Sequence, residues 1–155
     1  MNRVLAIWNR ARGSSLKRKF FSYMVCRQAP YFSTIRPTFE VLEPGRAEVT
    51  MKNRRAVHNH IATVHAIAMC NLAELAAGTM TEVSIPASMR WLPKGMTVRY
   101  VRKAETDLRA IATLPVIEEG VAADVPAQVE IRDTAGHVVC EATITMYVSP
   151  RKKAA

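Results

Sequence analysis

One acidic residue, Glu74, stands in the most apolar segment of the chain, residues 61–78. It is the only acid between Glu48 and Glu82. Burying a carboxylate among apolar side chains is costly unless it is paired or protonated, so packing alone would favour an apolar residue there. A buried carboxylate suits a general base that activates water, or a nucleophile. We therefore expect Glu74 to be buried and to carry any chemistry, with a solvated or ion-paired glutamate as the alternative.

The residues that open this segment could supply the second half of such a reaction. A helix N-terminus has unpaired N–H groups and the positive end of the helix dipole, which can stabilise the oxyanion formed when a carbonyl carbon is attacked. The order of residues places the N–H groups of Ala66 and Ile67 at that position. Asn59 is a further candidate catalytic residue, with a simple helix cap as the alternative. His65 either is a buried histidine that orients the preceding loop or takes part in catalysis directly.

The spacing of His65 and Glu74 indicates more than one copy of the chain. They are nine positions apart, which is about 900° of helical rotation and therefore half a turn net. Side chains on opposite sides of one helix can hardly reach one substrate. Two chains side by side can bring both residues to one substrate if the Glu74 of each chain lies at the helix opening of the other. We therefore expect a homodimer or a dimer of dimers.

The histidines near this segment could suggest a zinc site. His58, His60 and His65 lie close together in sequence, but no Cys or acidic residue follows at ligand spacing. Zinc in proteins is bound by four Cys, His or acidic side chains, or by three such side chains and a water molecule. We therefore expect neither a metal nor a cofactor.

The positive charge of the chain is concentrated at its start. The net charge is +9, yet residues 1–39 hold eight Lys or Arg and no acid, while the remainder holds 14 basic and 13 acidic residues. The folded body therefore lacks the basic face that nucleic-acid binding needs. The start has no continuous apolar stretch and no A-x-A cleavage site, so we expect no secretion, whereas an organelle transit role stays open.

The cysteines are consistent with a reducing compartment. The chain has three, at widely separated positions and without a C-x-x-C pair. Such a set gives no disulfide framework, so we expect reduced thiols and a cytoplasmic protein.

A second group of cations follows the apolar segment. Arg90 and Lys94 come first, and Arg102 and Lys103 follow after a short stretch that includes Arg99. Guanidinium and ammonium groups bind phosphates, so this group could hold the phosphates of a ligand. The alternative is a solvated edge of a sheet, where charged residues are common.

The surrounding pattern predicts the elements that must hold these residues. Residues 61–78 are apolar almost all round, which predicts a helix that is buried on every side, ending at Gly78 as a C-cap. His65, Asn71 and Glu74 within it argue against a membrane span. One buried helix cannot be covered by a flat sheet, so an antiparallel sheet must curl around it. Two short helices are predicted at 2–12 and 15–28, and residues 79–95 are predicted to be irregular. The alternating pattern predicts strands at 35–43, 46–52, 96–103, 106–117, 125–133 and 137–148.

Two stretches resemble a known family. The run Asn59-His60-Ile61-Ala62-Thr63-Val64-His65-Ala66-Ile67 is similar to the N-x-x-G-T-x-H-G-G opening of the central helix in hotdog thioesterases of the phenylacetyl-CoA type. Glu74 matches the spacing to the catalytic acid of that family. Residues 89–104, which include Met89-Arg90-Trp91-Leu92-Pro93-Lys94-Gly95-Met96, resemble the bacterial branch known as DUF4442.

The resemblance covers residues 35–148 and implies the fold, the activity and the assembly. The fold would be α+β, a hotdog with a long curved antiparallel sheet wrapped around one central helix. The function would be that of an acyl-CoA thioesterase, active as a dimer. The chain departs from the family motif at Ala62, Ala66 and Ile67, which replace glycines, and at Glu74, which replaces the common aspartate. A backbone N–H survives such changes, but the added Cβ narrows the approach to it.

The sequence is therefore consistent with two functions. The first is hydrolysis of an acyl-CoA thioester, and the second is a non-catalytic hotdog module that binds an acyl chain or an acyl-carrier partner. We expect a basic helical arm over residues 1–30 and a hotdog domain over 31–150. The arm lies outside the resemblance, so we expect it to be dispensable for chemistry and to pack on the sheet edge or touch an anionic surface.

Overall fold

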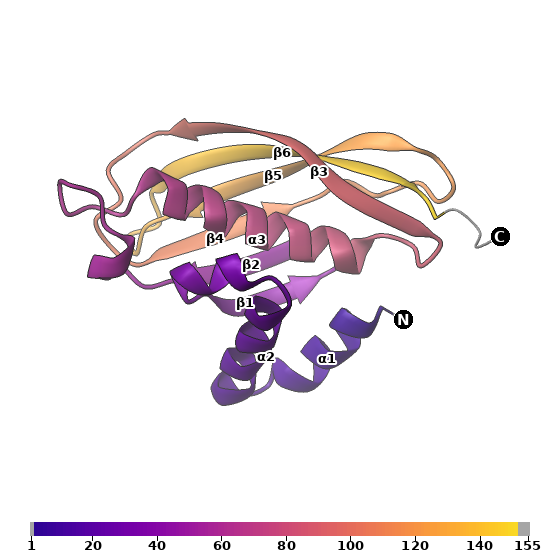
Figure 1. Cartoon of the computed structure of the whole chain (residues 1–155), viewed down its shortest axis with the longest axis horizontal. Coiled ribbons are helices and arrows are strands. Elements are labelled where there is room, and N and C mark those ends of the chain that lie inside the picture. The colour runs from indigo at the N-terminus through magenta and orange to yellow at the C-terminus, as the bar shows by residue number, and fades with distance from the viewer. Residues whose placement is uncertain (1, 152–155) are drawn as a thin grey trace.

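The computed structural model of the protein describes residues 2–151, in which a six-stranded antiparallel sheet curves around one long helix (Figure 1). The strand order across the sheet is β1-β2-β4-β5-β6-β3, so β1 and β3 form its two edges. The strands are β1 (Thr38–Glu43), β2 (Arg46–Met51), β3 (Met89–Tyr100), β4 (Leu108–Thr113), β5 (Ala123–Arg132) and β6 (Val138–Pro150).

The central helix α3 (Ala66–Ser84) contacts every strand of the sheet. Its sheet-facing side is built from Leu72, Ala73, Ala76 and Met80, all of which are fully buried. The alanines let the helix lie close to the strands, and the larger side chains fill the space on either side of them. None of the helices in residues 2–151 is long and apolar enough to cross a membrane. The predicted curled sheet around one helix is confirmed, but the helix is not buried on every side, because Ile67 is 54% exposed and Glu74 is also exposed.

The bounds of this helix differ from the prediction at both ends. Residues 61–65 belong to the preceding loop, and the helix continues through Gly78 to Ser84. Gly78 lies inside the helix and is not its cap. A Cβ at this position would lie 3.0 Å from the ring carbon Cη2 of Trp91. The glycine is a site of close approach between α3 and β3, and a C-cap signal cannot be told from such a packing contact in the sequence.

Strand β3 also begins earlier than predicted. The sequence around Pro93 and Gly95 predicted an irregular segment, yet β3 passes through both residues, with a shift of register between them where it pairs with β6. A proline has no N–H to donate, but β3 is an edge strand, where a missing donor is tolerated. The edge position, which is a property of the whole sheet, explains why the local signal failed.

Two predicted N-terminal helices are present and share the core of the domain. They are α1 (Arg3–Ala11) and α2 (Ser15–Gln28), and the short 3₁₀ helices η1 (Pro30–Ile35) and η2 (Arg55–Val57) follow later in the chain. Trp8 of α1 and Phe21 of α2 have ring centroids 5.2 Å apart, and Phe21 lies edge-on to Phe39 of β1 at 5.3 Å. Aromatic burial of this kind contributes strongly to stability, so the two helices are integral to the fold.

Glu48 on the outer face of the sheet links neighbouring strands. Its carboxylate lies 2.6 Å from Arg46 and 2.6 Å from Arg109 of β4. Burial alone would raise the pKa of Glu48, but the hydrogen bonds from Arg46 and Arg109 outweigh it and hold the pKa below its ordinary value of 4.5. A lowered pKa means that the ionised carboxylate stabilises the folded state.

We expect Glu48→Gln to lower the free energy of unfolding by about 1 kcal/mol at pH 7. The stability from this carboxylate is fully present above its unfolded pKa and is lost as the pH falls through the lower folded value. The difference between parent and variant should therefore narrow below about pH 4.5. Urea unfolding at neutral and acidic pH measures it, with Glu118→Gln, an exposed residue, as the control. A pH-independent difference would contradict the prediction.

Candidate active site

The loop before α3 is organised by the side chain of Asn59. Its Oδ1 accepts hydrogen bonds from the N–H groups of Ile61 and Thr63, each at 3.1 Å, and its Nδ2 donates to Thr63 Oγ1 at 2.8 Å. Asn59 therefore does not cap α3, as the sequence suggested, because its polar atoms are used within the loop. It is a positioning residue that shapes the approach to the helix.

His65 is the N-cap of α3. Its backbone is extended, and its ring Nδ1 accepts the N–H of Ile67 at 3.0 Å. The side chain is exposed, not buried. Of the two N–H groups expected to face an oxyanion, that of Ile67 is thus occupied, whereas that of Ala66 has no acceptor among residues 2–151. Within residues 2–151, the N–H of Ala66 is therefore free to donate to an oxyanion, whereas the N–H of Ile67 is hydrogen-bonded to His65.

Ala62 stands where the related motif has a glycine, and its backbone conformation shows why a glycine is favoured at this position. Its φ is 61°, in the left-handed region that side chains with a Cβ rarely adopt. Such a conformation costs an L-residue about 1–2 kcal/mol. The tight turn that returns the chain to His65 is retained in spite of this strain.

We expect Ala62→Gly to raise the free energy of unfolding by about 1 kcal/mol, because glycine adopts positive φ without strain. Thermal and urea unfolding measure it. Ala87→Gly is the matched control, since Ala87 is exposed and does not have a positive φ. The control should be neutral or destabilising, and a loss of stability in Ala62→Gly would contradict the prediction.

Glu74 lies on the one face of α3 that the sheet leaves open. Ile67, Cys70 and Glu74 follow one another at intervals of three and four residues, so they share this face, and the side chains of Ile67 and Glu74 are exposed. The expectation that Glu74 is buried is wrong for the single chain. The sequence could not show it, because the neighbours that make the segment apolar face the sheet. Glu74 lies about 12 Å along the helix from Ala66, too far for both to act on one carbonyl.

A cavity of about 400 Å³ opens beside Glu74. Its floor is α3, and its walls come from β3 and from the N-terminal helices. Apart from Glu74, Glu82 and Gln28, its lining is largely apolar. The lining residues are Val4, Val25, Gln28, Ala29, Phe32, Glu74, Leu75, Gly78, Thr79, Glu82, Trp91 and Pro93. The arm thus builds one wall, which argues against its being dispensable, and neither this wall nor Trp91 was found by sequence reasoning.

The two carboxylates in this cavity have different surroundings. Glu82 accepts the indole N–H of Trp91 at 2.8 Å and is bonded to the amide of Asn2 at 3.2 Å. Glu74 has no hydrogen-bond or ion-pair partner among residues 2–151. Glu82 therefore ties β3 and α1 to the helix, while Glu74 is free to meet a substrate or a second chain.

The apolar surface around Glu74 continues onto the edge strand β3. Met96 and Tyr100 pair with Ile144 and Cys140 of β6, so they lie on the helix-facing side of the sheet, yet they are 37% and 50% exposed. The Tyr100 hydroxyl lies 3.2 Å from Cys70 Sγ. This hydrogen bond, together with burial, raises the pKa of Tyr100 to about 12. The open face of α3 and the uncovered part of β3 therefore form one surface.

Arg90 and Lys94 are engaged by neighbouring strands. Lys94 lies 2.7 Å from the carboxylate of Asp124 and above the ring of Tyr147, and Arg90 Nε donates to Ser149 Oγ at 3.2 Å. Both cations lie toward the start of β3, far from the start of α3. The expected cluster of phosphate-binding cations is thus divided along the strand.

Arg102 and Lys103 lie at the other end of β3. The carbonyl oxygen of the next residue, Ala104, accepts the N–H of Val64 at 2.8 Å, which places these cations beside the start of α3. Both are exposed, and neither forms an ion pair within the described chain. They are the members of the predicted group that remain available to an anion near Ala66.

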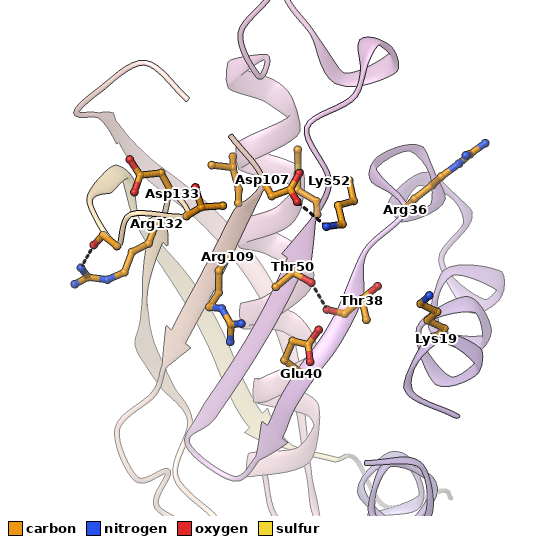
Figure 2. A pocket seen from close by; sticks show the side chains of 14 residues that line it. Lys19, Arg36, Thr38, Glu40, Thr50, Lys52, Asp107, Arg109, Arg132 and Asp133 are labelled. Carbon is orange, nitrogen blue, oxygen red and sulfur yellow. Dashed lines mark hydrogen bonds and ion pairs between the residues drawn. The ribbon is translucent and has the colours of Figure 1, made fainter. Parts of the chain in front are cut away.

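A larger polar hollow of about 630 Å³ lies on the opposite face of the sheet (Figure 2). Its cations are largely paired, as Lys52 is with Asp107 and Arg109 with Glu48. None of the site residues predicted from the sequence lines it. Residues 2–151 also contain no group of three or more side chains placed to hold a metal ion. The apolar cavity at Glu74 is therefore the better candidate for the active site.

Known proteins resemble this chain in sequence and structure. Residues 17–148 match the family described as a domain of unknown function, DUF4442. A crystal structure of a structural-genomics protein is 45% identical and superimposes with a TM-score of 0.83, over 96% of this chain and 98% of the other. A Pseudomonas aeruginosa protein of unknown function, described as a probable thioesterase, is 26% identical, with a TM-score of 0.75 over 84% and 93% of the two chains.

More distant structures share the fold. A thioesterase from Haemophilus influenzae is 15% identical, with a TM-score of 0.69 over 77% of this chain and 82% of the other. No curated protein sequence matches the chain. The curved antiparallel sheet around one helix is the hotdog fold of these thioesterases, and the chain belongs to the DUF4442 family.

Proposed function

We propose that this protein is an acyl-CoA thioesterase that uses Glu74 as its base. One observation carries the proposal: an unpartnered carboxylate stands at the wall of a largely apolar cavity. The cavity suits the acyl part of a thioester, and a carboxylate at its edge suits the activation of water. The thioesterases among the structural neighbours have the same fold and support this reaction class.

In the proposed reaction, Glu74 of one chain takes a proton from water, and the hydroxide attacks the thioester carbon. The N–H of Ala66 in the partner donates to the oxyanion as it forms. The tetrahedral intermediate then collapses, the C–S bond breaks, and the proton returns from Glu74 to the sulfur of coenzyme A. Arg102 and Lys103 beside Ala66 bind phosphates of the leaving group. No metal or cofactor takes part.

This arrangement needs two chains, and the uncovered surface supports a dimer. Glu74 and Ala66 are too far apart within one chain, whereas an antiparallel approach of two α3 helices would exchange them. Strand β3 is an unpaired edge, and Met96, Tyr100 and Ile67 expose apolar area beside it. Exposed edges and apolar patches of this kind are typical of interaction sites.

We expect light scattering at micromolar concentration to give at least twice the monomer mass of 17.3 kDa. Met96→Asp, which places a charge in the proposed interface, should shift the protein toward the monomer. Val116→Asp is the control, because Val116 is 99% exposed and lies in the loop after β4, outside both α3 and β3. A monomeric parent would contradict the proposed site.

The function is tested by hydrolysis of a panel of CoA esters with short, branched, aromatic and long acyl groups, without added metal. Turnover of at least one ester above the rate of a Glu74→Gln preparation supports the proposal. The alternative is a hotdog module that binds an acyl chain or an acyl-carrier partner without cleaving the thioester. Binding of acyl-CoA without any hydrolysis would favour it, and the engaged N–H of Ile67 would be its structural reason.

A further inference from the structure

The outer face of α1 and α2 exposes large apolar side chains. Leu16, Phe20, Tyr23 and Met24 recur at intervals of three, four, seven and eight residues, so they lie on one side of α2. Each is between 48% and 76% exposed, and the rings of Phe20 and Tyr23 are 6.5 Å apart. Ile7 of α1, 45% exposed, lines a shallow hollow of about 230 Å³ together with Phe20 and Met24.

These side chains are not needed to hold α2 in place. The core contacts of the helix come from its other side, where Phe21, Ser22 and Cys26 are buried. Ser22 Oγ also accepts the N–H of Phe39 in β1 at 2.9 Å. The helix is thus apolar on two opposite faces, and the domain covers only one of them.

Unpaired cations surround the exposed apolar side chains. Arg18 is directed to Glu40 of β1 at 3.4 Å, but the other basic residues of the two helices form no ion pair within residues 2–151. No Asp or Glu occurs in residues 1–39. In Figure 1 the two helices project together from the body of the domain, below the sheet. The exposed cations are Arg3, Arg10, Arg12, Lys17, Lys19 and Arg27.

We propose that this face of α1 and α2 docks on an anionic lipid bilayer. Apolar side chains flanked by Lys and Arg are the pattern of helices that lie in the membrane interface, with the apolar groups at the acyl boundary and the cations at lipid phosphates. A second copy of the chain would bring like charges together, and a nucleic acid would leave the apolar side chains in water. The face has only a shallow hollow of about 230 Å³, which suits a deformable lipid surface better than a rigid ligand.

The proposal is tested with the full chain and vesicles, independently of any catalytic activity. Sedimentation should show binding to vesicles of equal parts phosphatidylcholine and phosphatidylserine, and much weaker binding to phosphatidylcholine alone. Raising the salt from 0.1 M to 1 M should weaken binding, because the Debye length falls from about 10 Å to about 3 Å. A chain that does not bind the anionic vesicles at low salt would overturn the proposal.

Matched variants separate insertion from simple attraction of charges. The double variant Leu16→Ser with Phe20→Ser should lower the vesicle partition coefficient at least tenfold, whereas Val116→Ser, a change at an apolar residue that is 99% exposed and lies outside α1 and α2, should leave it unaltered. Lys17→Glu with Arg27→Glu should lower it as well. Circular dichroism checks that each variant is folded. If only the charge variants lose binding, or if soluble polyglutamate binds the parent as tightly as vesicles do, the bilayer is not the partner.

Discussion

Replacing Glu74 by Gln should lower kcat on a responsive CoA ester by about 10²-fold or more, with little change in KM. The substitution keeps the size and polarity of an exposed side chain but removes its ability to take a proton. Because Glu74 makes no hydrogen bond or ion pair within residues 2–151, the fold and the dimer should survive. Steady-state kinetics, with light scattering and thermal unfolding of the same preparations, measure the effect.

Glu82→Gln is the matched control for this experiment. It makes the same chemical change on the same helix and in the same cavity, but Glu82 accepts a hydrogen bond from Trp91 that a glutamine oxygen can also accept. Its kcat should stay within a few-fold of the parent. Equal losses in the two variants would show that the charge of the cavity matters and not the base. Full activity of Glu74→Gln would mean that the base is another group.

Replacing Ala66 by Pro should lower kcat by about 10²–10³-fold, because it deletes the N–H of Ala66, which has no acceptor within residues 2–151. Proline is tolerated at the first position of a helix, where the N–H has no partner within the helix. The preceding residue, His65, has φ −63° and ψ 139°, an extended conformation that a following proline favours. The helix content by circular dichroism should therefore be unchanged. Ala66→Ser, which keeps the N–H, is the control and should retain activity.

Mixing the two inactive variants tests whether the site is shared between chains. In a mixed dimer of Glu74→Gln and Ala66→Pro chains, one site combines the intact Ala66 of the first with the intact Glu74 of the second, and the other site lacks both. Random association should therefore restore about a quarter of the parental activity. A site contained within one chain predicts no recovery. Co-expression with two different affinity tags isolates the mixed dimer, which should then show about half of the parental activity, since one of its two sites is intact.

The architecture was largely determined by local patterns in the sequence. The segment around Glu74 is rich in apolar residues, and the later segments alternate with a period of two, so the sequence predicted a curled antiparallel sheet around one helix. The same patterns predicted α1 and α2 and the hairpin of β1 and β2. These features depend on residues close together in the chain, and their physical cause, burial of apolar area, is visible in the spacing.

The details of the site were decided by contacts between distant segments. Gly78 carries a helix-ending signal, yet Trp91 from β3 packs on it and the helix continues. Glu74 looked buried by its neighbours in sequence, but those neighbours face the sheet and leave it exposed. The sequence indicates a separate charged arm, whereas the structure places Trp8 in the core and Val4 in the wall of the cavity. Sequence spacing shows which residues share a face, whereas only the tertiary structure shows what covers that face.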